Sequence, residues 1–308
     1  MKEMKHPNIL GIDFVRQESY YIYLILPFSD GGDLDKCFKE KVRADEKKNR
    51  KGVDLTEEQI LFWALKIIAA VGYFHSKKIV HRDLKMANIL IEKNSDLKVC
   101  DFGLAYQFKT DSETENKACG TPTTMAPEVI NSQPYRMMPD WWSVGIILYQ
   151  FMNHVTPFQN PPFENKPGLS ENEKEEQRKK QIKELYDRAC NRAIEWDEAA
   201  KKYSPELIDL VKRLLDRDPK TRIGSKDSSK EILAHAVFKP EFVERVAKGG
   251  YKPQIVPDCF DFDQDFDLAS NKLKIDKAMD CFTPEDKNKI DGNKDKFEDD
   301  CFGETTMA

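Results

Sequence analysis

The stretch of sequence that decides the fold lies between residues 81 and 103. It opens with His81-Arg82-Asp83-Leu84-Lys85-Met86-Ala87-Asn88 and closes, thirteen residues after Asn88, with Asp101-Phe102-Gly103. Between these two runs, residues 88–91 and 97–100 predict short strands joined by turn residues 94–96. We expect this hairpin to gather four polar side chains in one region, namely Asp83, Lys85, Asn88 and Asp101.

These four side chains suit phosphoryl transfer. That chemistry needs a carboxylate to orient a hydroxyl, oxygen ligands for Mg²⁺ and a cation against the moving phosphate. Each residue alone is also compatible with an ordinary turn, in which Asp and Asn are common. The ordinary-turn interpretation does not explain the order and spacing of the whole set.

A third run, Ala126-Pro127-Glu128, extends the pattern. The order H-R-D-L-x-x-x-N, then D-F-G, then A-P-E resembles the signature of the protein-kinase family. The resemblance implies an α+β fold, with a mainly helical large lobe, a remnant of a β-rich small lobe and an extended C-terminal tail. It divides the chain into residues 1–29 (small-lobe remnant and hinge), 30–238 (large lobe) and 239–308 (acidic tail).

The resemblance implies a role for each polar residue. Asp83 is similar to the catalytic-loop aspartate that accepts the substrate hydroxyl proton, and Asn88 and Asp101 are similar to the Mg²⁺ ligands. Lys85 resembles the lysine that steadies the transferring phosphate. A lysine at that place favours serine/threonine over tyrosine kinases. Thr121 resembles the threonine that, in the serine/threonine class, ties the catalytic loop to the substrate-binding segment.

The upstream residues resemble a nucleotide site. Residues 23–26 form an apolar run that we expect to be a buried strand, and residues 27–34 resemble the hinge and the start of the next helix. The implied ATP-binding set is Leu26 as gatekeeper, the Pro27 carbonyl and the Ser29 amide for the adenine, Asp33, and Leu90 as the floor. Asp33 is also the remaining candidate for reading a substrate arginine, because Ala87 replaces the acid that often does so.

Two further features resemble structural elements of the family. Asp140 opens an apolar helix and is expected to hold the catalytic-loop backbone from below. Glu128 and Arg222 resemble a buried ion pair. Removing one partner of such a buried pair lowers the stability of the fold by roughly 3–5 kcal/mol.

The sequence before residue 11 lacks part of the family pattern. Residues 6–9 resemble the link between the helix αC and the fourth strand of a small lobe. A complete kinase places a Gly-rich loop, a strand lysine and a helix glutamate before this point. Two explanations compete: a truncated sequence of a normal kinase, or a short form that acts as an inactive binding or regulatory module. The presence of all four polar residues favours truncation.

Composition narrows the class of protein. The net charge is −5, and residues 257–308 hold fifteen Asp or Glu against seven Lys, so the acidic excess belongs to the tail. This balance gives no reason to expect nucleic-acid binding. No apolar run approaches the ~20 residues that span a bilayer, and the start has no signal-peptide pattern, so we expect no membrane span. Seven cysteines without C-x-x-C spacing read as reduced thiols and favour a cytoplasmic location.

Helix signals organise the large lobe. We expect helices over residues 54–77, 140–152, 170–192 and 204–215. Thr56 with Gln59, and Ser170 with Glu173, predict capping boxes at two of them. Residues 239–268 resemble the C-terminal tail of the cyclic-nucleotide-dependent and protein-kinase-C-like group.

Residues 101–128 form the expected activation segment. Three hydroxyl residues, Thr110, Ser112 and Thr114, are candidates for phosphorylation, and Arg82 is placed to pair with such a phosphate. Many kinases of this type carry a threonine where this chain has Lys117, so the chain departs from the family's usual activation switch at this position. The expected partner is a protein substrate, and the sequence identifies no regulatory partner.

Overall fold

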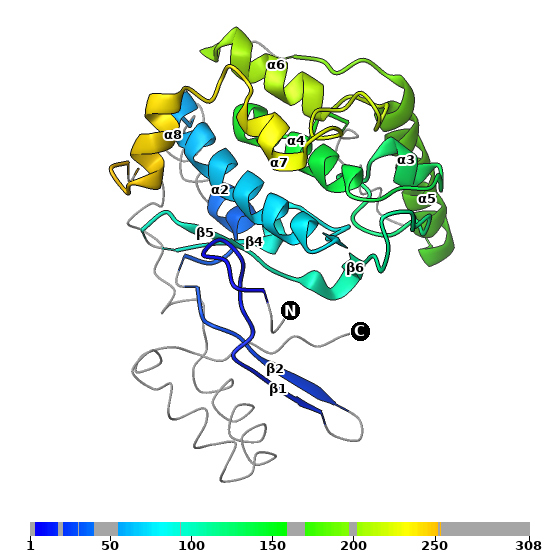
Figure 1. Ribbon diagram of the computed structural model, residues 1–308. Helices are drawn as coiled ribbons and strands as arrows, with labels where there is room; N and C mark the ends of the chain where they lie inside the picture. The colour runs from blue at the N-terminus through cyan, green and yellow to red at the C-terminus, as the bar shows by residue number, and fades with distance from the viewer. Residues whose placement is uncertain are drawn as a thin grey trace.

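The computed structural model describes residues 4–17, 21–29, 31–39, 55–92, 94–158, 170–196, 202–251 and 253. The described part has α+β architecture, in which helices form most of the body and short strands pair in two-stranded antiparallel sheets (Figure 1). The strands are β1 (Phe14–Gln17), β2 (Ile22–Ile25), β3 (Ile79–Val80), β4 (Ile89–Ile91), β5 (Leu97–Val99) and β6 (Tyr106–Gln107). The helices are α2 (Glu57–Ser76), α3 (Pro127–Ile130), α4 (Met138–Asn153), α5 (Glu171–Asn191), α6 (Pro205–Leu214), α7 (Ser228–Leu233) and α8 (Pro240–Ala247). Residues 34–39 are also helical.

Helices α2 and α4 form the centre of the core. Helix α2 begins at the predicted capping box, where the Thr56 hydroxyl accepts from the Gln59 amide and the Gln59 side chain accepts from the Thr56 amide. Trp63 and Trp141 are fully buried on the two helices. Helix α2 packs against α4 and α7, and α4 packs against α6 (Figure 1). Burial of large apolar side chains on both helices supplies the main stabilisation of this lobe.

Sequence signals also located the ends of two outer helices. Helix α5 begins at the predicted capping box of Ser170 and Glu173. Helix α6 begins after Ser204, whose hydroxyl accepts from the Leu207 amide. Helix α5 touches α3, and its buried residues are Leu185 and Ala189. The described part of α5 is therefore an amphipathic surface helix with a narrow apolar stripe.

The hairpin β4–β5 carries the catalytic-loop and D-F-G runs at its ends. Ile89 pairs with Val99 and Ile91 pairs with Leu97, as the sequence predicted. All four side chains are buried. Strand β5 packs on α2, so the hairpin is fixed to the core helix.

The ribbon β1–β2 corrects one sequence-based expectation. Residues 22–25 form a strand, paired with β1 from Phe14↔Ile25 to Gln17↔Ile22. The burial expected for residues 23–26 is wrong, because Leu24 is 42% exposed and the other three are only partly buried. The neighbouring Ile22 is 62% exposed. An apolar run can form a strand without being buried when one face of a two-stranded ribbon lacks a covering layer. In the described residues, that face is open.

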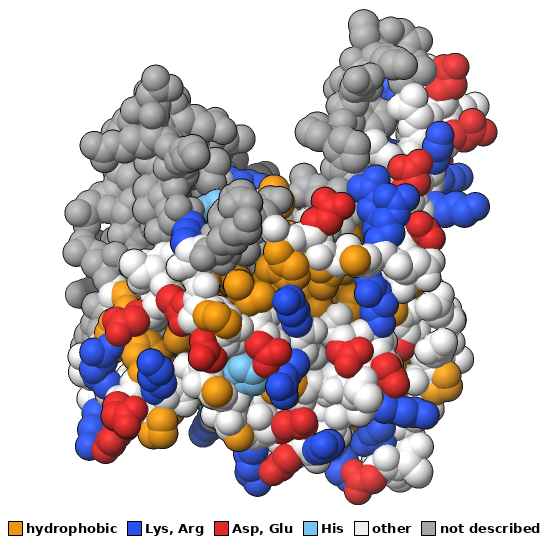
Figure 2. Space-filling model, turned by 90° about the horizontal axis from the view of Figure 1, so that it is seen from above, with side chains coloured by type: hydrophobic (Ala, Val, Ile, Leu, Met, Phe, Trp, Pro, Cys, Tyr) orange, Lys and Arg blue, Asp and Glu red, His pale blue; other side chains and the backbone are white. Residues whose placement is uncertain are grey.

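The hydrophobicity of helix α2 and the charges on the molecular surface both fit a packed helical core. Helix α2 is long and apolar enough to cross a membrane by length and composition alone, but 67% of that stretch is buried inside the fold, as expected of a core helix. Among the described residues it is the helix that meets this test. Figure 2 shows acidic and basic side chains interspersed over the face seen from above, with hydrophobic side chains near its middle.

Candidate active site

Asp140 at the start of α4 holds the catalytic loop from below. The carboxylate is fully buried and accepts hydrogen bonds from the backbone amides of His81 at 2.9 Å and Arg82 at 3.0 Å. Its Oδ2 also lies 2.8 Å from Nε2 of His75. Arg82 has a φ of 70°, a left-handed conformation that the two amide contacts stabilise. The predicted role of Asp140 is confirmed by these contacts.

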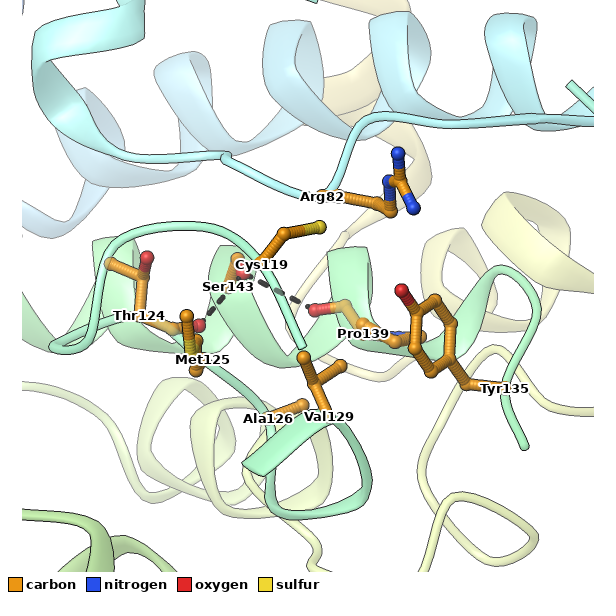
Figure 3. Close-up of a pocket in the computed structure, with 9 residues that line it drawn as sticks. All are labelled: Arg82, Cys119, Thr124, Met125, Ala126, Val129, Tyr135, Pro139 and Ser143. Atoms are coloured by element: carbon orange, nitrogen blue, oxygen red, sulfur yellow. Dashed lines mark hydrogen bonds between the residues drawn. The ribbon is translucent and has the colours of Figure 1, made fainter. Parts of the chain in front are cut away.

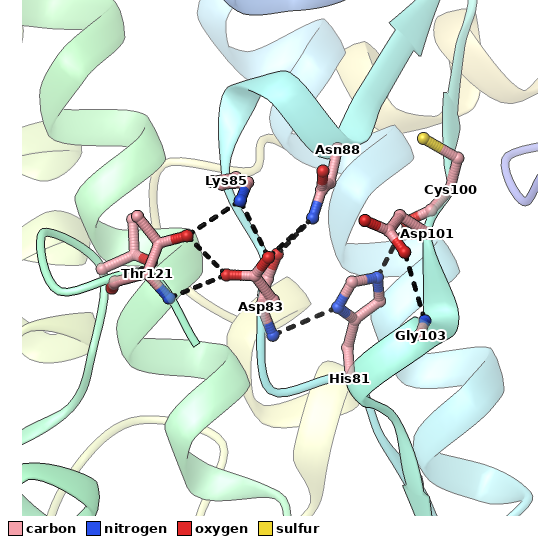
Figure 4. Close-up of polar contacts among 9 residues, drawn as sticks. His81, Asp83, Lys85, Asn88, Cys100, Asp101, Gly103 and Thr121 are labelled. Atoms are coloured by element: carbon pink, nitrogen blue, oxygen red, sulfur yellow. Dashed lines mark hydrogen bonds and ion pairs between the residues drawn. The ribbon is translucent and has the colours of Figure 1, made fainter. Parts of the chain in front are cut away.

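Asp83 is the centre of a closed polar network (Figure 4). Its Oδ1 accepts from the backbone amide of Thr121 at 2.8 Å and from the Thr121 hydroxyl at 2.7 Å. Lys85 Nζ donates to Asp83 Oδ2 and to Thr121 Oγ1, both at 2.8 Å. Asn88 Nδ2 donates to the Asp83 carbonyl at 2.8 Å and to Oδ2 at 3.1 Å. The structure therefore brings together the four predicted residues Asp83, Lys85, Asn88 and Thr121.

The network sets the charge of Asp83. Burial raises the pKa of Asp83, but hydrogen bonds from Lys85 and Thr121 outweigh it, and the pKa lies below its ordinary value of 3.8. The group is therefore an ionised carboxylate at neutral pH. A carboxylate of low pKa is a weak base. Asp83 is therefore better suited to orienting a hydroxyl donor than to removing its proton before phosphoryl transfer begins.

Gly120 allows Thr121 to reach Asp83. Its φ is 111°, and a Cβ there would lie 2.4 Å from the Arg82 carbonyl oxygen. A residue with a side chain would both strain the backbone and clash with the catalytic loop. The Gly-Thr pair thus locks the activation segment to the loop.

His81 joins the catalytic loop to the end of β5. Its Nε2 lies 2.9 Å from the Cys100 carbonyl oxygen, and the Asp83 amide donates to its Nδ1 at 3.3 Å. These contacts assign the neutral tautomer with the proton on Nε2. Burial lowers the pKa of His81 more than the neighbouring Asp140 carboxylate raises it, which keeps the ring neutral. Phe102 packs on the ring at a centroid distance of 4.7 Å.

Asp101 and Asn88 offer oxygen ligands on the same side of the hairpin (Figure 4). Asp101 is exposed, has a φ of 59°, and accepts from the Gly103 amide at 3.2 Å. Both contacts of the Asn88 side-chain amide are made by Nδ2, so Oδ1 is the atom that would contact a metal. Among the described residues, no group of three or more His, Cys, Asp or Glu side chains is placed to hold a metal. Mg²⁺ fits such a pair, because it commonly takes one or two protein oxygens together with substrate phosphates.

Cys100 lies beside these ligands as an unreactive thiol. Burial raises its pKa to about 12, aided by the charges of Asp101 and Asp33. At neutral pH the group is protonated, so it behaves as a small, partly buried apolar side chain.

Four of the predicted nucleotide residues, Leu26, Pro27, Ser29 and Asp33, lie on the segment that follows β2, and Leu90 lies on β4. Asp33 forms an isolated antiparallel bridge with Leu90, and the Ile91 amide donates to the Gly32 carbonyl at 2.8 Å. Leu26 and Pro27 are partly buried on the way to this contact. The Asp33 carboxylate accepts from the Lys36 amide at 2.9 Å, so it also caps the helix over residues 34–39.

Ser29 has an unusual environment in this segment. Its residue is 6% exposed, and its hydroxyl has no hydrogen-bond partner in the described part of the chain. Buried polar groups are normally paired, so an orphaned hydroxyl fits a site that receives a polar ligand. This observation is compatible with the adenine-binding prediction for residues 26–29.

The ion pair between Glu128 and Arg222 anchors the end of the activation segment. Arg222 donates to both carboxylate oxygens, at 2.6 and 2.9 Å, and both side chains are buried. Arg222 also donates to the carbonyls of Asp216 and Met138. The predicted pair is confirmed as a structural contact, and its extra hydrogen bonds satisfy the buried guanidinium.

A small cavity lies beneath the activation segment (Figure 3). Its volume is about 10 Å³, room for a single water molecule, and its lining includes Arg82, Cys119 and Tyr135. Ser143 Oγ below it donates to the carbonyls of Thr124 and Pro139. The cavity is a packing feature of the segment and is too small for a nucleotide.

Sequence reasoning missed the partner of Arg82. Its guanidinium pairs with Glu115 at 3.2 Å, whereas Thr110, Ser112 and Thr114 are all exposed. The available signal was a glutamate two residues before Lys117, but its contact with Arg82 depends on the path of the whole segment.

Comparison with known proteins agrees with this geometry. Residues 1–238 match the protein kinase domain family, and the chain belongs to that family. It is 29% identical over 281 residues to RAC-beta serine/threonine-protein kinase B of Xenopus laevis, covering 89% of this chain and 51% of the relative. It is 30% identical over 248 residues to serine/threonine-protein kinase Sgk1 of Homo sapiens, covering 77% of this chain and 48% of the relative.

The relatives confirm the serine/threonine type and the relation to the cyclic-nucleotide-dependent and protein-kinase-C-like group. The chain spans about half the length of the curated relatives it matches.

Proposed function

We propose that this protein transfers the γ-phosphate of ATP, with Mg²⁺, to serine or threonine hydroxyls of protein substrates. The single observation that carries the proposal is the closed contact of Asp83, Lys85 and Thr121. In this contact an ionised carboxylate (Asp83), a cation (Lys85) and the expected substrate-binding segment (Thr121) lie within hydrogen-bond distance of one another. Positioning and charge stabilisation are the main protein contributions to phosphoryl transfer.

The acceptor side follows from this network. Asp83 accepts the hydrogen bond of the substrate hydroxyl and so aligns its oxygen. Lys85 offers its ammonium to the transferred phosphoryl oxygens, at a position 2.8 Å from both Asp83 and Thr121. Thr121 fixes the substrate-binding segment against the loop.

The nucleotide side is proposed on fewer contacts. Asn88 and Asp101 would hold Mg²⁺, which supplies charge neutralisation at the phosphates when bound. Leu26, Pro27, Ser29 and Leu90 would receive the adenine, with the orphaned Ser29 hydroxyl as support. Asp33 lies beside them, bridged to Leu90.

The proposed organisation keeps the three expected parts. Residues 1–29 form the small-lobe remnant and hinge, residues 30–238 the large lobe, and residues 239–308 the tail. Support for a tail that starts near residue 239 comes from α8, whose Arg245 pairs with Glu58 of α2 at 3.0 Å. Tyr251 then packs on Phe62 at 5.7 Å. The rest of the expected tail lies outside the described residues.

A cytoplasmic location is part of the proposal. Within the described ranges, Cys100, Cys119 and Cys190 are free thiols. Free thiols suit a reducing compartment.

A second function remains open because of the ribbon β1–β2. Its apolar side chains Ile22 and Leu24 are exposed, which is typical of a surface that binds another protein segment. This favours, as the alternative, a non-catalytic binding or regulatory module built on a kinase large lobe.

Phosphotransfer from labelled ATP tests the proposal. Matched peptides that differ only in serine, threonine or tyrosine are offered to the full chain. We expect labelling of the first two peptides, and a loss of about 10²–10⁴-fold in rate for Asp83→Asn. Asp187→Asn, on an exposed carboxylate of α5, is the control and should keep the rate. Equal labelling by Asp83→Asn and wild type would refute the assigned role.

A further inference from the structure

The side chain of Arg82 connects the catalytic loop to the activation segment. Its backbone is fixed by Asp140, and its side chain, which is 10% exposed, crosses to the segment. Nε donates to the Leu104 carbonyl at 2.6 Å, and the guanidinium lies 5.5 Å from the ring centroid of Tyr106. NH1 donates to Glu115 Oε2 at 3.2 Å. Arg82 therefore joins Asp83 to three points of the segment.

Glu115 is itself held firmly. Its Oε1 accepts from the backbone amides of Asn116 at 2.8 Å and Lys117 at 3.1 Å. Its backbone pairs in both directions with Tyr135, at 3.0 and 2.7 Å. The amide of Asn116 is the strongest influence that keeps the pKa of Glu115 below its ordinary value, and Lys117 and Arg82 add to it. The carboxylate is therefore charged and aimed at Arg82.

The rest of the segment is also ordered by carboxylate contacts. Glu113 accepts from the Tyr106 hydroxyl at 2.5 Å and from the Lys109 amide at 2.6 Å. Arg136 donates to the backbone carbonyls of Thr110 and Glu113. Glu113 does not contact Arg82 among the described contacts, so the two glutamates have separable roles.

We propose that Glu115 is a positioning residue of the catalytic loop, which supplies to Arg82 the negative charge that a phosphorylated residue would otherwise supply. This inference rests on the proposed kinase function. A phosphate acts at such a place by charge and by oxygens that accept from an arginine. Glu115 provides the charge and accepts from Arg82 through Oε2, while its Oε1 is held by the backbone amides of Asn116 and Lys117. The three candidate hydroxyls at Thr110, Ser112 and Thr114 stay exposed.

The inference has a direct consequence for regulation. Arg82 is already paired, so its contact with the segment does not require phosphorylation of residues 101–128. The catalytic loop is then ordered in the chain as synthesised, and Lys117 at the usual threonine position is tolerated.

The first test is the variant Glu115→Gln, which removes the charge and keeps the shape. Glu113→Gln, in the same segment, is the matched control. For Glu115→Gln we expect kcat to fall on the order of tenfold, because typical coupling between two sites is of that size. The KM for ATP should stay within about twofold of the wild-type value. For Glu113→Gln we expect a smaller change in kcat. Equal effects of the two variants would overturn the proposal.

Hydrogen exchange gives a readout that does not depend on turnover. We expect faster exchange of the Arg82 and Asp83 amides in Glu115→Gln than in Glu113→Gln, since the catalytic-loop contact is lost only in the former. Unchanged exchange at these amides would overturn the role of Glu115. If the wild-type chain transfers no phosphate, the proposed function fails, and the exchange result alone decides this inference.

Phosphatase treatment is the complementary test. Removal of phosphate from the full chain, confirmed by mass spectrometry, should leave the rate within about twofold of the untreated protein. A tenfold or larger loss would show that a phosphate, and not Glu115, supplies the charge.

Discussion

The catalytic loop and the ribbon β1–β2 use their side chains in opposite ways. Around the loop, Asp83, Lys85 and Thr121 hydrogen-bond to one another, and the buried Asp140 holds the preceding backbone amides of His81 and Arg82. In the ribbon, Ile22 and Leu24 project to solvent, and backbone pairing with β1 is the main described contact. The difference teaches that the acceptor half of the site is organised by the contacts of the chain itself, whereas the ribbon contributes little packing. We expect variants in the two regions to differ accordingly.

The largest effect on stability is expected at the buried ion pair that anchors the end of the activation segment. Arg222→Ala leaves Glu128 charged, buried and unpaired, and should lower the free energy of unfolding by roughly 3–5 kcal/mol. Urea denaturation measures this change. Glu175→Ala is the control, because its ion pair with Lys179 is exposed and should be worth less than about 1 kcal/mol. A loss below 1 kcal/mol for Arg222→Ala would contradict the assigned role.

The junction between the two regions should show an intermediate effect. A Cβ on Gly31 would lie 2.2 Å from the Ile91 carbonyl oxygen, so Gly31→Ala must displace the backbone. We expect a loss of about 1–3 kcal/mol in denaturant unfolding. Gly11→Ala has no atom within 4 Å of its added Cβ and should change stability by no more than about 0.5 kcal/mol. Equal losses at both positions would show that residues 31 and 91 are not in close contact.

The buried histidine of the loop predicts a pH dependence of stability. The folded-state pKa of His81 is below its ordinary value of 6.5, so below that pH the unfolded chain binds a proton that the folded chain excludes. Stability therefore falls as the pH drops below 6.5, by at most about 1.4 kcal/mol per pH unit from this residue. Unfolding of the wild type and His81→Asn should be compared between pH 5 and 7. The same slope in both would exclude His81 as its source.

The smallest effect is expected on the open face of the ribbon. Ile22→Thr should change the free energy of unfolding by less than about 0.5 kcal/mol, since the side chain is already exposed. Ile89→Thr on the buried hairpin places a hydroxyl in the core and should cost about 2–4 kcal/mol. Similar losses would mean that the ribbon face is covered and that the comparison fails.

Local signals predicted most of the described helices and identified polar residues that the structure brings together. The capping boxes at Thr56 and Ser170 located two helices, because capping depends on residues three positions apart. The polar residues of the hairpin were found because a short turn brings them together. The roles given to these residues, and the adenine-binding set at residues 26–29, stay predictions.

Features set by long-range contacts escaped the sequence. The exposure of Leu24 depends on which other elements pack on the ribbon β1–β2. An apolar run in the sequence does not predict that packing. The pairing of Arg82 with Glu115 joins residues 33 positions apart and depends on the path of the activation segment. Sequence patterns identify charged residues that are able to form ion pairs, whereas the fold determines which of them come into contact.

ATP binding by the full chain, measured by calorimetry with and without Mg²⁺, separates a kinase from a binding module. We expect binding that needs Mg²⁺ and weakens by about tenfold or more in Asp101→Asn, because that variant removes a metal ligand. Asp111→Asn, on a carboxylate that is 85% exposed, should bind as the wild type does. Binding that is the same in Mg²⁺, in chelator and in Asp101→Asn, or no binding at all, would contradict a site in which Asn88 and Asp101 hold the metal nucleotide opposite Asp83.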